Sequence, residues 1–210
     1  MKKILIAVPC MDQVPAQFAS SLATLTKVDV CMVAFQIGSL IYTRRENLAV
    51  EAINRGCDYI MWFDSDMVFP PDTMQKLLAY IDSLGEGAIV TGAYYRRVAP
   101  YTPTLFNTLE IADDKATWTD VEEIPEGLFE VAACGFCCVL APAKAFMAVA
   151  AQFGSMFTPI NGIGEDLSFC WRARQAGYKI YCDPTIKLGH VGHFTITSDY
   201  YKLYLDAKEN

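Results

Sequence analysis

A short apolar run that ends in two aspartates constrains the fold of this chain more than any other feature. Tyr59 to Phe63 follow one another without a polar break, which is typical of a short strand covered on both faces of its sheet. Asp64 and Asp66 come next, and Pro70-Pro71 prevents the strand from continuing. The two aspartates are therefore expected at the point where a buried strand leaves its sheet.

That position favours ligand binding. Open α/β sheets bind their ligands at the carboxyl ends of the strands. Two carboxylates held there concentrate negative charge and offer hard oxygen ligands, which suit Mg²⁺ or Mn²⁺ carrying a phosphate. The alternative is an ordinary acidic loop, because Asp-x-Asp by itself is a common pattern.

Strand-like and helix-like segments alternate over the first hundred residues. The predicted strands are Ile4 to Val8, Val30 to Phe35, Tyr59 to Phe63 and Ala88 to Val90. The predicted helices between them are Pro15 to Thr26, Thr43 to Arg55 and Asp72 to Leu84. Such alternation implies right-handed crossovers and a mainly parallel sheet. With 210 residues, the chain predicts a single-domain three-layer α/β/α sandwich.

The pattern changes after Pro100. Residues 100–128 are polar and acidic and predict hairpins and loops on the rim of the sheet. The segments expected to follow are a strand from Phe129 to Leu140 bent at Gly135, helices from Ala141 to Phe153 and from Glu165 to Gln175, and a strand from Tyr178 to Cys182. A small antiparallel element is therefore expected from this part of the chain.

Composition narrows the functional classes. The net charge of −7 argues against broad contact with nucleic acid or anionic lipid, although a local basic patch stays open. The apolar runs are far shorter than the ~18 residues of a membrane span, and the first residues predict a strand rather than a signal peptide. The eight cysteines lie mostly in apolar runs and indicate reduced core thiols of a cytoplasmic protein. Zinc at Cys134, Cys137 and Cys138 is the alternative, but no second pair with metal spacing follows.

The order of the motifs resembles a GT-A glycosyltransferase, similar to the family 2 group and to compact phage and bacterial members. The resemblance covers about residues 3 to 195. The motifs that carry it are Val8-Pro9 at the end of the first strand, Asp64-Ser65-Asp66, Gly164-Glu165-Asp166 at the start of a helix containing Cys170-Trp171-Arg172 and ending at Gly177-Tyr178, and the late Gly189-His190.

The resemblance implies a metal-dependent transfer of a sugar from a UDP- or GDP-linked donor, of the hexosyltransferase type. Mn²⁺ or Mg²⁺ would neutralise the charge that grows on the diphosphate leaving group. Asp66 is implied as the direct metal ligand, and Asp64 would help through metal-bound water or the ribose. His190 is implied as the ligand that completes the coordination, with His193 as the alternative.

Two acidic residues are implied as the catalytic pair. Asp166 would be the general base that takes the acceptor proton, so that the anomeric configuration inverts, and Glu165 would orient the acceptor or Asp166. The helix N-terminus is expected to keep Asp166 ionised. The alternative is that both residues only cap the helix, a role compatible with catalysis.

The remaining donor contacts are also expected at the sheet edge. Arg45 would hold the diphosphate, although Arg44-Arg45-Glu46 differs from the usual Ala-Arg-Asn pattern of the family. The other expected contacts are Pro9 and Asp12 for the base and ribose, Ser65, and Tyr95 and Arg97 in the Tyr94-Tyr95-Arg96-Arg97 stretch. Residues 1–99 would form the nucleotide-sugar half and residues 100–210 the acceptor and catalytic half.

Three other functions compete with this interpretation. A sugar-nucleotide nucleotidyltransferase would need a glycine-rich, basic loop after the first strand, and residues 9–14 contain neither glycine nor a basic residue. A non-catalytic nucleotide-sugar-binding domain would not need the complete set of Asp64, Asp66, Asp166 and His190. Glycoside hydrolysis by paired carboxylates explains the strand-end aspartates less well than a metal does. The acceptor hydroxyl could belong to a glycan, a lipid, a protein or a modified base, and nucleic acid is disfavoured by charge.

Overall fold

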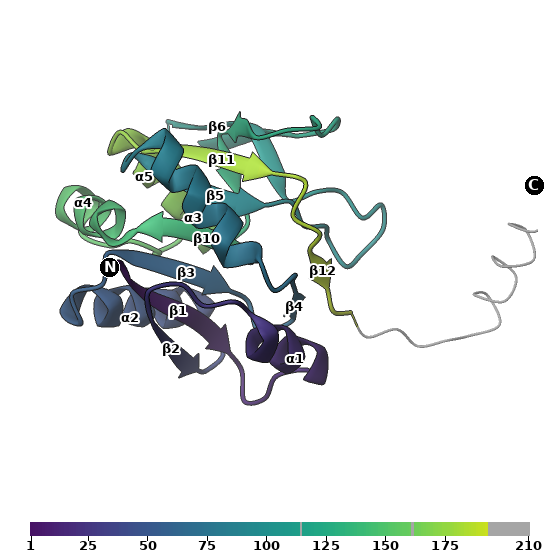
Figure 1. The fold of residues 1–210 in the computed structure, drawn as a ribbon. Coiled ribbons are helices and arrows are strands. Elements are labelled where there is room, and N and C mark those ends of the chain that lie inside the picture. Colours follow the sequence, from purple (N-terminus) through teal and green to yellow (C-terminus); the bar gives the residue numbers. More distant parts are fainter. Residues whose placement is uncertain (114, 161, 193–210) are drawn as a thin grey trace, which may run out of the picture.

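The computed structural model describes residues 1–113, 115–160 and 162–192. A seven-stranded sheet with the order β2-β1-β3-β10-β5-β11-β8 lies at its centre (Figure 1). Its strands are β1 (Lys3–Cys10), β2 (Val30–Ile37), β3 (Tyr59–Phe63), β5 (Ala88–Gly92), β8 (Phe129–Val131), β10 (Cys138–Pro142) and β11 (Lys179–Asp183).

The sheet is mainly parallel, as predicted. β1 is parallel to both β2 and β3, and β11 is parallel to β5. β10 runs antiparallel between β3 and β5, and β8 runs antiparallel at the edge beyond β11. The carboxyl ends of β1, β2, β3, β5 and β11 therefore meet at one edge of the sheet.

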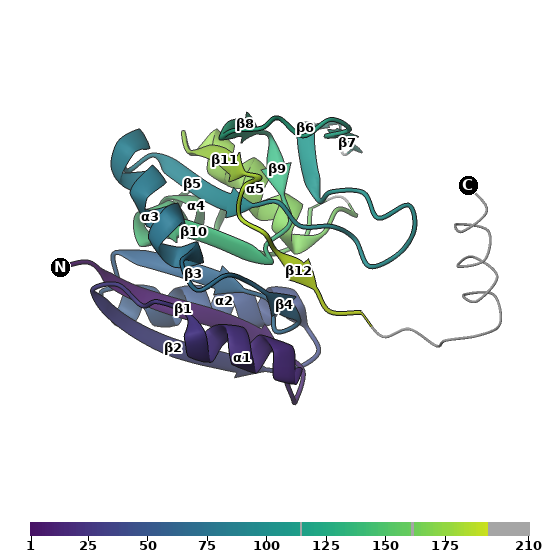
Figure 2. The ribbon, with the colours of Figure 1, turned by 45° about the vertical axis from the view of Figure 1, so that its right-hand side comes forward.

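Helices cover both faces of the sheet and complete the predicted three-layer, single-domain sandwich. The helices are α1 (Ala16–Thr24), α2 (Ile41–Asn54), α3 (Thr73–Leu84), α4 (Ala143–Phe153) and α5 (Glu165–Gln175). Alternate residues of β1 point to opposite faces. Ile6 belongs to the core cluster that includes Phe18 of α1 and residues of α3, whereas Leu5 belongs to the cluster that includes Leu48 of α2 and residues of α4 and α5. In Figure 2, α1 and α3 lie in front of the sheet and α2 lies behind it. No helix among the described residues is long and apolar enough to cross a membrane.

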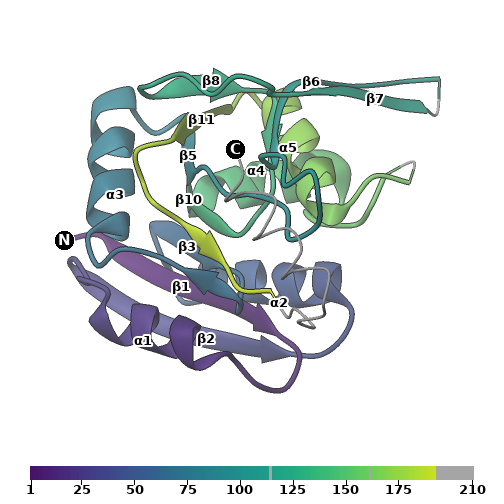
Figure 3. The same ribbon diagram turned by 90° about the vertical axis from the view of Figure 1, so that its right-hand side faces the viewer.

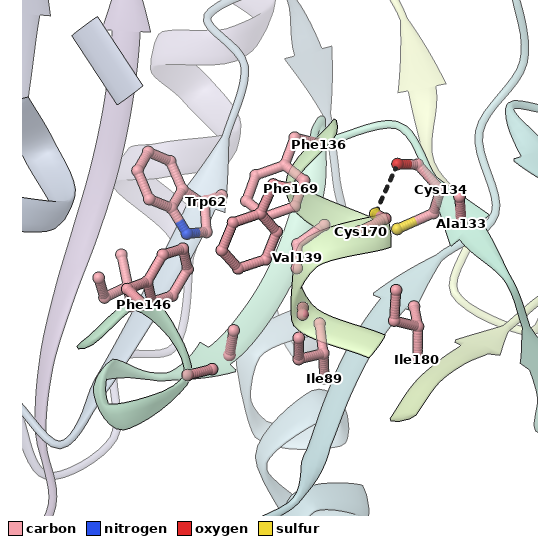
Figure 4. Packing of buried hydrophobic residues seen from close by; sticks show 14 of the residues in the cluster. Trp62, Ile89, Ala133, Cys134, Phe136, Val139, Phe146, Phe169, Cys170 and Ile180 are labelled. Atoms are coloured by element: carbon pink, nitrogen blue, oxygen red, sulfur yellow. Dashed lines mark hydrogen bonds between the residues drawn. The ribbon is translucent and has the colours of Figure 1, made fainter. Parts of the chain in front are cut away.

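An aromatic cluster anchors the end of β3 (Figure 4). The ring centroid of Trp62 lies 5.6 Å from that of Phe136 and 5.8 Å from that of Phe146. Phe169 of α5 stacks on Phe146 of α4, with centroids 4.6 Å apart. Each such pair contributes about 0.5–1.5 kcal/mol beyond the burial of its area. The cluster therefore holds the end of β3 and the start of α5 in a defined relation.

Two small antiparallel sheets complete the fold. β7 (Lys115–Asp120), β6 (Leu105–Ala112) and β9 (Ala133–Cys134) form one, and its β6–β7 hairpin extends beyond the main sheet at the top of Figure 3. β4 (Met67–Val68) and β12 (Gly189–His190) form the other, with His190 opposite Met67. The predicted antiparallel element is confirmed, and the second pair brings a late part of the chain beside Asp66.

The structure corrects two predicted strands. The stretch from Phe129 to Leu140 is not one bent strand but three short ones, β8, β9 and β10, in two sheets. The chain breaks at Gly135, whose N–H donates to Thr104 O at 3.0 Å and where a Cβ would lie only 1.7 Å from the Tyr94 hydroxyl. The first strand continues through Pro9 to Cys10, because β1 pairs with β2 along its whole length, with Pro9 opposite Gln36 and Cys10 opposite Ile37.

Candidate functional site

Asp64 and Asp66 lie where the sequence predicts them, at the carboxyl end of β3. The Asp64 N–H donates to Cys137 O at 3.1 Å, and the Met67 N–H donates to Asp64 O at 3.2 Å, so the chain turns sharply out of the sheet. The two carboxylates take different partners. Asp64 contacts Arg45 and Cys137, and Asp66 contacts Arg97 and His190.

On the inner side, Arg45 of α2 joins the end of β3 to the start of α5. Its Nη2 lies 2.8 Å from Asp64 Oδ1, and its Nε lies 3.2 Å from Glu165 Oε1. The third donor, Nη1, reaches Phe136 O at 3.4 Å. Burial alone would lower the pKa of Arg45, but the two carboxylates raise it above its ordinary value. A guanidinium that is only 2% exposed and already paired with two carboxylates acts as a link within the protein.

This position differs from the one expected for Arg45, at the open edge where a diphosphate would bind. The Arg45 guanidinium forms ion pairs with Asp64 and Glu165 instead. Burial raises the pKa of Asp64, and Arg45 opposes that shift. The Cys137 thiol adds a contact of 3.0 Å to Asp64 Oδ2, and burial raises the pKa of this thiol well above its ordinary value, so it stays protonated and donates. Sequence reasoning missed Cys137, because a thiol in an apolar run carries no signal of a polar partner.

Among the described residues, the cysteines do not form the zinc site that was considered as an alternative. Cys134 of β9 belongs to the core cluster that includes α2, α4 and α5, whereas Cys137 and Cys138 belong to the cluster that includes α1 and α3. Across residues 1–113, 115–160 and 162–192, no three His, Cys, Asp or Glu side chains gather as a ready-made metal cage.

On the outer side, Asp66 meets Arg97 and His190. Its Oδ2 lies 2.8 Å from Arg97 Nη1 and 3.5 Å from His190 Nε2. Burial would raise the pKa of Asp66, but His190 and Arg97 hold it below its usual range. Partial burial would likewise lower the pKa of His190, but the contact with Asp66 raises it.

Asp66 and His190 fit a divalent cation. His190 Nδ1 lies 2.9 Å from Tyr95 O, so a proton on Nδ1 donates to this carbonyl and leaves the Nε2 lone pair directed at Asp66. Mg²⁺ and similar ions are commonly held by one or two carboxylates together with substrate phosphates and water, so two protein ligands suffice. Tyr95 therefore contributes through its backbone. His193, the alternative ligand, lies outside the described residues.

Glu165 and Asp166 open α5, as predicted. Asp166 Oδ1 accepts a hydrogen bond from Leu167 N at 2.8 Å, which is a local helix-start contact. Burial, followed by the charge of Glu165, raises the pKa of Asp166 from 3.8 to about 6. With this pKa Asp166 is mainly ionised at pH 7, although burial opposes the effect of the helix N-terminus on its charge.

Three hollows surround these residues. One of about 560 Å³ is lined by Asp12, Gln13, Ser65, Asp66 and Arg97 among others. A neighbouring one of about 170 Å³ is lined by Pro9, Gly38, Ser39, Asp64 and Ser65 among others. A third, of about 330 Å³, lies beside Asp166. The expected donor residues other than Arg45 and Tyr95 thus line the first two hollows. Gly38 and Ser39 were missed, although their place after the second strand puts them at the same sheet edge.

Comparison with known proteins agrees with this fold. The Glycosyl transferase family 2 model matches residues 40–137, slightly less than half of the chain. This segment contains Arg45, Asp64, Asp66 and Arg97, but it ends before Glu165, Asp166 and His190. No curated protein matches the chain.

Two solved structures illustrate the likeness. The crystal structure of A197 from STIV is 18% identical, covers 91% of this chain and 86% of its own, and has a TM-score of 0.64. The crystal structure of GalNAc-T7 with UDP, GalNAc and Mn²⁺ is 9% identical, covers 92% of this chain, and has a TM-score of 0.61. This chain spans 44% of the GalNAc-T7 chain. Together these findings show a GT-A fold like that of family 2 glycosyltransferases.

Proposed function

We propose that the protein is a glycosyltransferase that moves a sugar from a nucleoside diphosphate to an acceptor hydroxyl, with inversion. One observation carries the proposal: Asp66 and His190, which are 124 positions apart in the sequence, meet at one edge of the sheet. Arg45 joins the start of α5, where Asp166 lies, to the same edge. Family 2 similarity over residues 40–137 supports the same activity, and GalNAc-T7, of the same fold, was solved with UDP and Mn²⁺.

Donor binding is assigned to the outer side of the site. Asp66 and His190 would hold Mn²⁺ or Mg²⁺, which when bound neutralises the charge that develops on the diphosphate. Arg97 adds positive charge to the hollow that Asp66 and Asp12 line, where a diphosphate would lie. The smaller hollow, with Pro9 and Ser65, is assigned to the nucleoside. Residues 1–99 then supply most donor contacts, and His190 is the contribution of the second half.

The proton transfer is assigned to Asp166. Its carboxylate lines the hollow of about 330 Å³ and takes the proton of the attacking acceptor hydroxyl. A pKa of about 6 makes it a better base than an exposed aspartate while leaving it mainly ionised at neutral pH. Glu165 is bound to Arg45 Nε and therefore positions the start of α5 rather than taking a proton.

Donor binding is tested by thermal unfolding with Mn²⁺ and a panel of nucleoside diphosphates. A ligand that binds only the folded state must raise the unfolding temperature. We expect UDP or GDP to stabilise the protein only when Mn²⁺ is present. Mass analysis of the products then separates sugar transfer from nucleotidyl transfer. Identical stability with and without Mn²⁺ across the panel would refute metal-dependent donor binding.

The Asp166→Asn variant tests the base. It keeps the shape and the local hydrogen bond but cannot accept a proton, so turnover should fall by roughly 10²–10⁴-fold while donor binding stays near the parental value. Glu165→Gln should cost less. Near-parental turnover of Asp166→Asn, or a product with retained configuration, would remove Asp166 from this role.

A further inference from the structure

The hollow of about 330 Å³ beside Asp166 has one open aromatic wall. Trp118 of β7 lines it and is 47% exposed, whereas Phe106, which also lines it, is buried. Trp118 pairs with Leu109 across the β6–β7 hairpin, and cross-strand partners point to the same side. Leu109 is fully buried in the core on the α5 side, so Trp118 presents its ring on the side of the hairpin that faces α5.

Two glycines contribute to the wall of the hollow next to Asp166. Gly162 and Gly164 lie directly before α5 and line the hollow together with Asp166. A Cβ at Gly164 would lie 2.7 Å from Asp166 Oδ1, so any larger residue would crowd this carboxylate. The glycine therefore leaves Asp166 accessible from the hollow that Trp118 borders.

Arg96 supplies the polar part of the wall. Its Nη2 lies 3.8 Å from Asp120 Oδ1, and its backbone N–H donates to Thr102 O at 3.0 Å, which places the residue at the rim of the hollow. About half of its side chain is exposed. Its guanidinium carries several N–H donors and no acceptor, so it suits a ligand rich in oxygen acceptors.

We infer that this hollow binds a neutral saccharide, whose terminal ring stacks on Trp118 and presents a hydroxyl to Asp166 while Arg96 donates to the other hydroxyls. This inference rests on the proposed function and names its acceptor class. A sugar ring combines an apolar C–H face, which matches an exposed indole, with a rim of hydroxyls, which match Arg96 and Asp166.

Size and charge favour a neutral sugar over other acceptors. A volume of about 330 Å³ is at the low end for ligand pockets, so it suits one ring rather than a lipid chain. Asp166 lies in the wall and Asp120 offsets the charge of Arg96, so a phosphorylated or otherwise anionic acceptor gains no net attraction there. A peptide hydroxyl remains an outcome that the test can reveal.

Tryptophan fluorescence tests binding without turnover. The probes are the methyl glycosides of glucose, galactose, mannose and N-acetylglucosamine, added to the whole protein with UDP and Mn²⁺. At least one should change the emission saturably in the parent protein and fail to do so in Trp118→Phe. Trp62 is buried and Trp171 is partly buried against Phe153, so Trp118 is the indole that lines this hollow. The absence of a saturable change with every glycoside, in a protein that UDP and Mn²⁺ still stabilise, would overturn the inference.

Kinetics provide the second measurement. With the best glycoside as acceptor, Trp118→Ala should raise the acceptor KM at least tenfold, Trp118→Phe should raise it less, and Arg96→Ala should raise it several-fold. Phe35→Ala is the matched control, because Phe35 is an equally exposed aromatic residue on the edge strand β2, and it should leave both KM and kcat unchanged.

The results separate the two proposals. An unchanged acceptor KM in Trp118→Ala, or transfer to a serine or threonine peptide but to no glycoside, would overturn the saccharide inference while leaving the glycosyltransferase proposal standing. Failure of Mn²⁺-dependent nucleotide stabilisation in the parent protein would instead defeat the proposed function, and the acceptor inference with it.

Discussion

Two arginine–aspartate pairs lie two residues apart along the same strand end, with the same separation and opposite surroundings. Arg45 Nη2 and Asp64 Oδ1 are 2.8 Å apart, and so are Arg97 Nη1 and Asp66 Oδ2. The Arg45 side chain is 3% exposed, whereas that of Arg97 is 47% exposed. The separation of the charged atoms therefore does not distinguish the two pairs. The Asp64 and Asp66 side chains are similarly exposed, at 22% and 25%, so the difference lies in the arginines. Arg45 is enclosed by the protein, whereas Arg97 lies on the wall of an open hollow.

The difference shows how one strand end serves two purposes. Burial raises the pKa of Asp64, whereas His190 and Arg97 hold that of Asp66 below its usual range. A buried charge must keep its partner, because an unpaired charge inside a protein is very costly. An exposed pair can exchange its partner for a ligand at little cost. We therefore expect Asp64 to maintain the site and Asp66 to bind the ligand.

The largest effect is expected for Arg45→Met. The variant leaves Asp64 and Glu165 close together without a cation, so the free energy of unfolding should fall by about 3–5 kcal/mol. Urea unfolding followed by circular dichroism measures this change. A loss below about 1 kcal/mol would show that water or rearrangement compensates the inner pair, and the contrast between the two pairs would disappear.

The next effect concerns Asp66→Asn. The variant should lose the Mn²⁺-dependent stabilisation by nucleotide, which for the parent protein at 100 times Kd is about 2.7 kcal/mol. Without ligand its stability should change by less than about 1 kcal/mol, because the contacts that are lost are only partly buried and Arg97 is about half exposed. Calorimetric titration with Mn²⁺ and UDP measures the binding. Asp72→Asn, which alters a surface ion pair with Lys76, serves as the control.

Measuring activity and stability over a range of pH extends the comparison to Asp166, which follows Glu165 of the inner ion-pair network. Because its pKa is raised to about 6, kcat/KM should fall about tenfold per pH unit below that value. Stability depends on pH in the opposite direction from activity. The folded state favours the protonated carboxyl, so the contribution of Asp166 to the free energy of unfolding declines as pH rises from 3.8 to about 6. Asp166→Asn should therefore be no less stable than the parent protein at pH 7.5. A clear loss of stability there would indicate that Asp166 acts mainly as a structural cap.

The smallest effect is expected for Arg97→Met. Loss of an exposed ion pair should change the free energy of unfolding by less than about 1 kcal/mol, and added salt should reduce the difference further. The same urea experiment as for Arg45→Met gives the direct comparison. Nucleotide affinity should weaken, since Arg97 lines the hollow assigned to the diphosphate. A stability loss as large as that of Arg45→Met would show that exposure is a poor guide here.

Much of the fold follows from local patterns. The apolar run from Tyr59 to Phe63 is observed as β3 with the predicted bounds, and the helix predicted at Thr43 is observed from Ile41. The strands between Phe129 and Leu140 could not be predicted in the same way. Apolar composition predicts an extended chain but does not show which strand each residue pairs with. Its division among β8, β9 and β10 depends on Gly135 and on the tight contact with Tyr94.

The positions of candidate site residues could be predicted where those residues directly follow a strand or begin a helix. Asp66 and His190 were proposed as partners and lie 3.5 Å apart, and Asp166 opens a helix as expected. Arg45 was assigned to the diphosphate because it matches a position where similar proteins carry an arginine at a helix start. Its burial depends on Asp64 and on Glu165, which lies 120 positions later, and no local pattern reports such a distant partner.

The position of β10 has a consequence for how the chain is made. β10 is inserted between β3 and β5, although it is synthesised after both. Until Pro142 has left the ribosome, β3 has an unpaired edge composed entirely of apolar residues, which is the kind of edge that associates with other chains. Residues 1–99 are therefore not a unit that can complete its part of the sheet before the rest of the chain is made. The nascent chain must be protected over this interval, and truncation between residues 100 and 137 should yield an aggregating fragment.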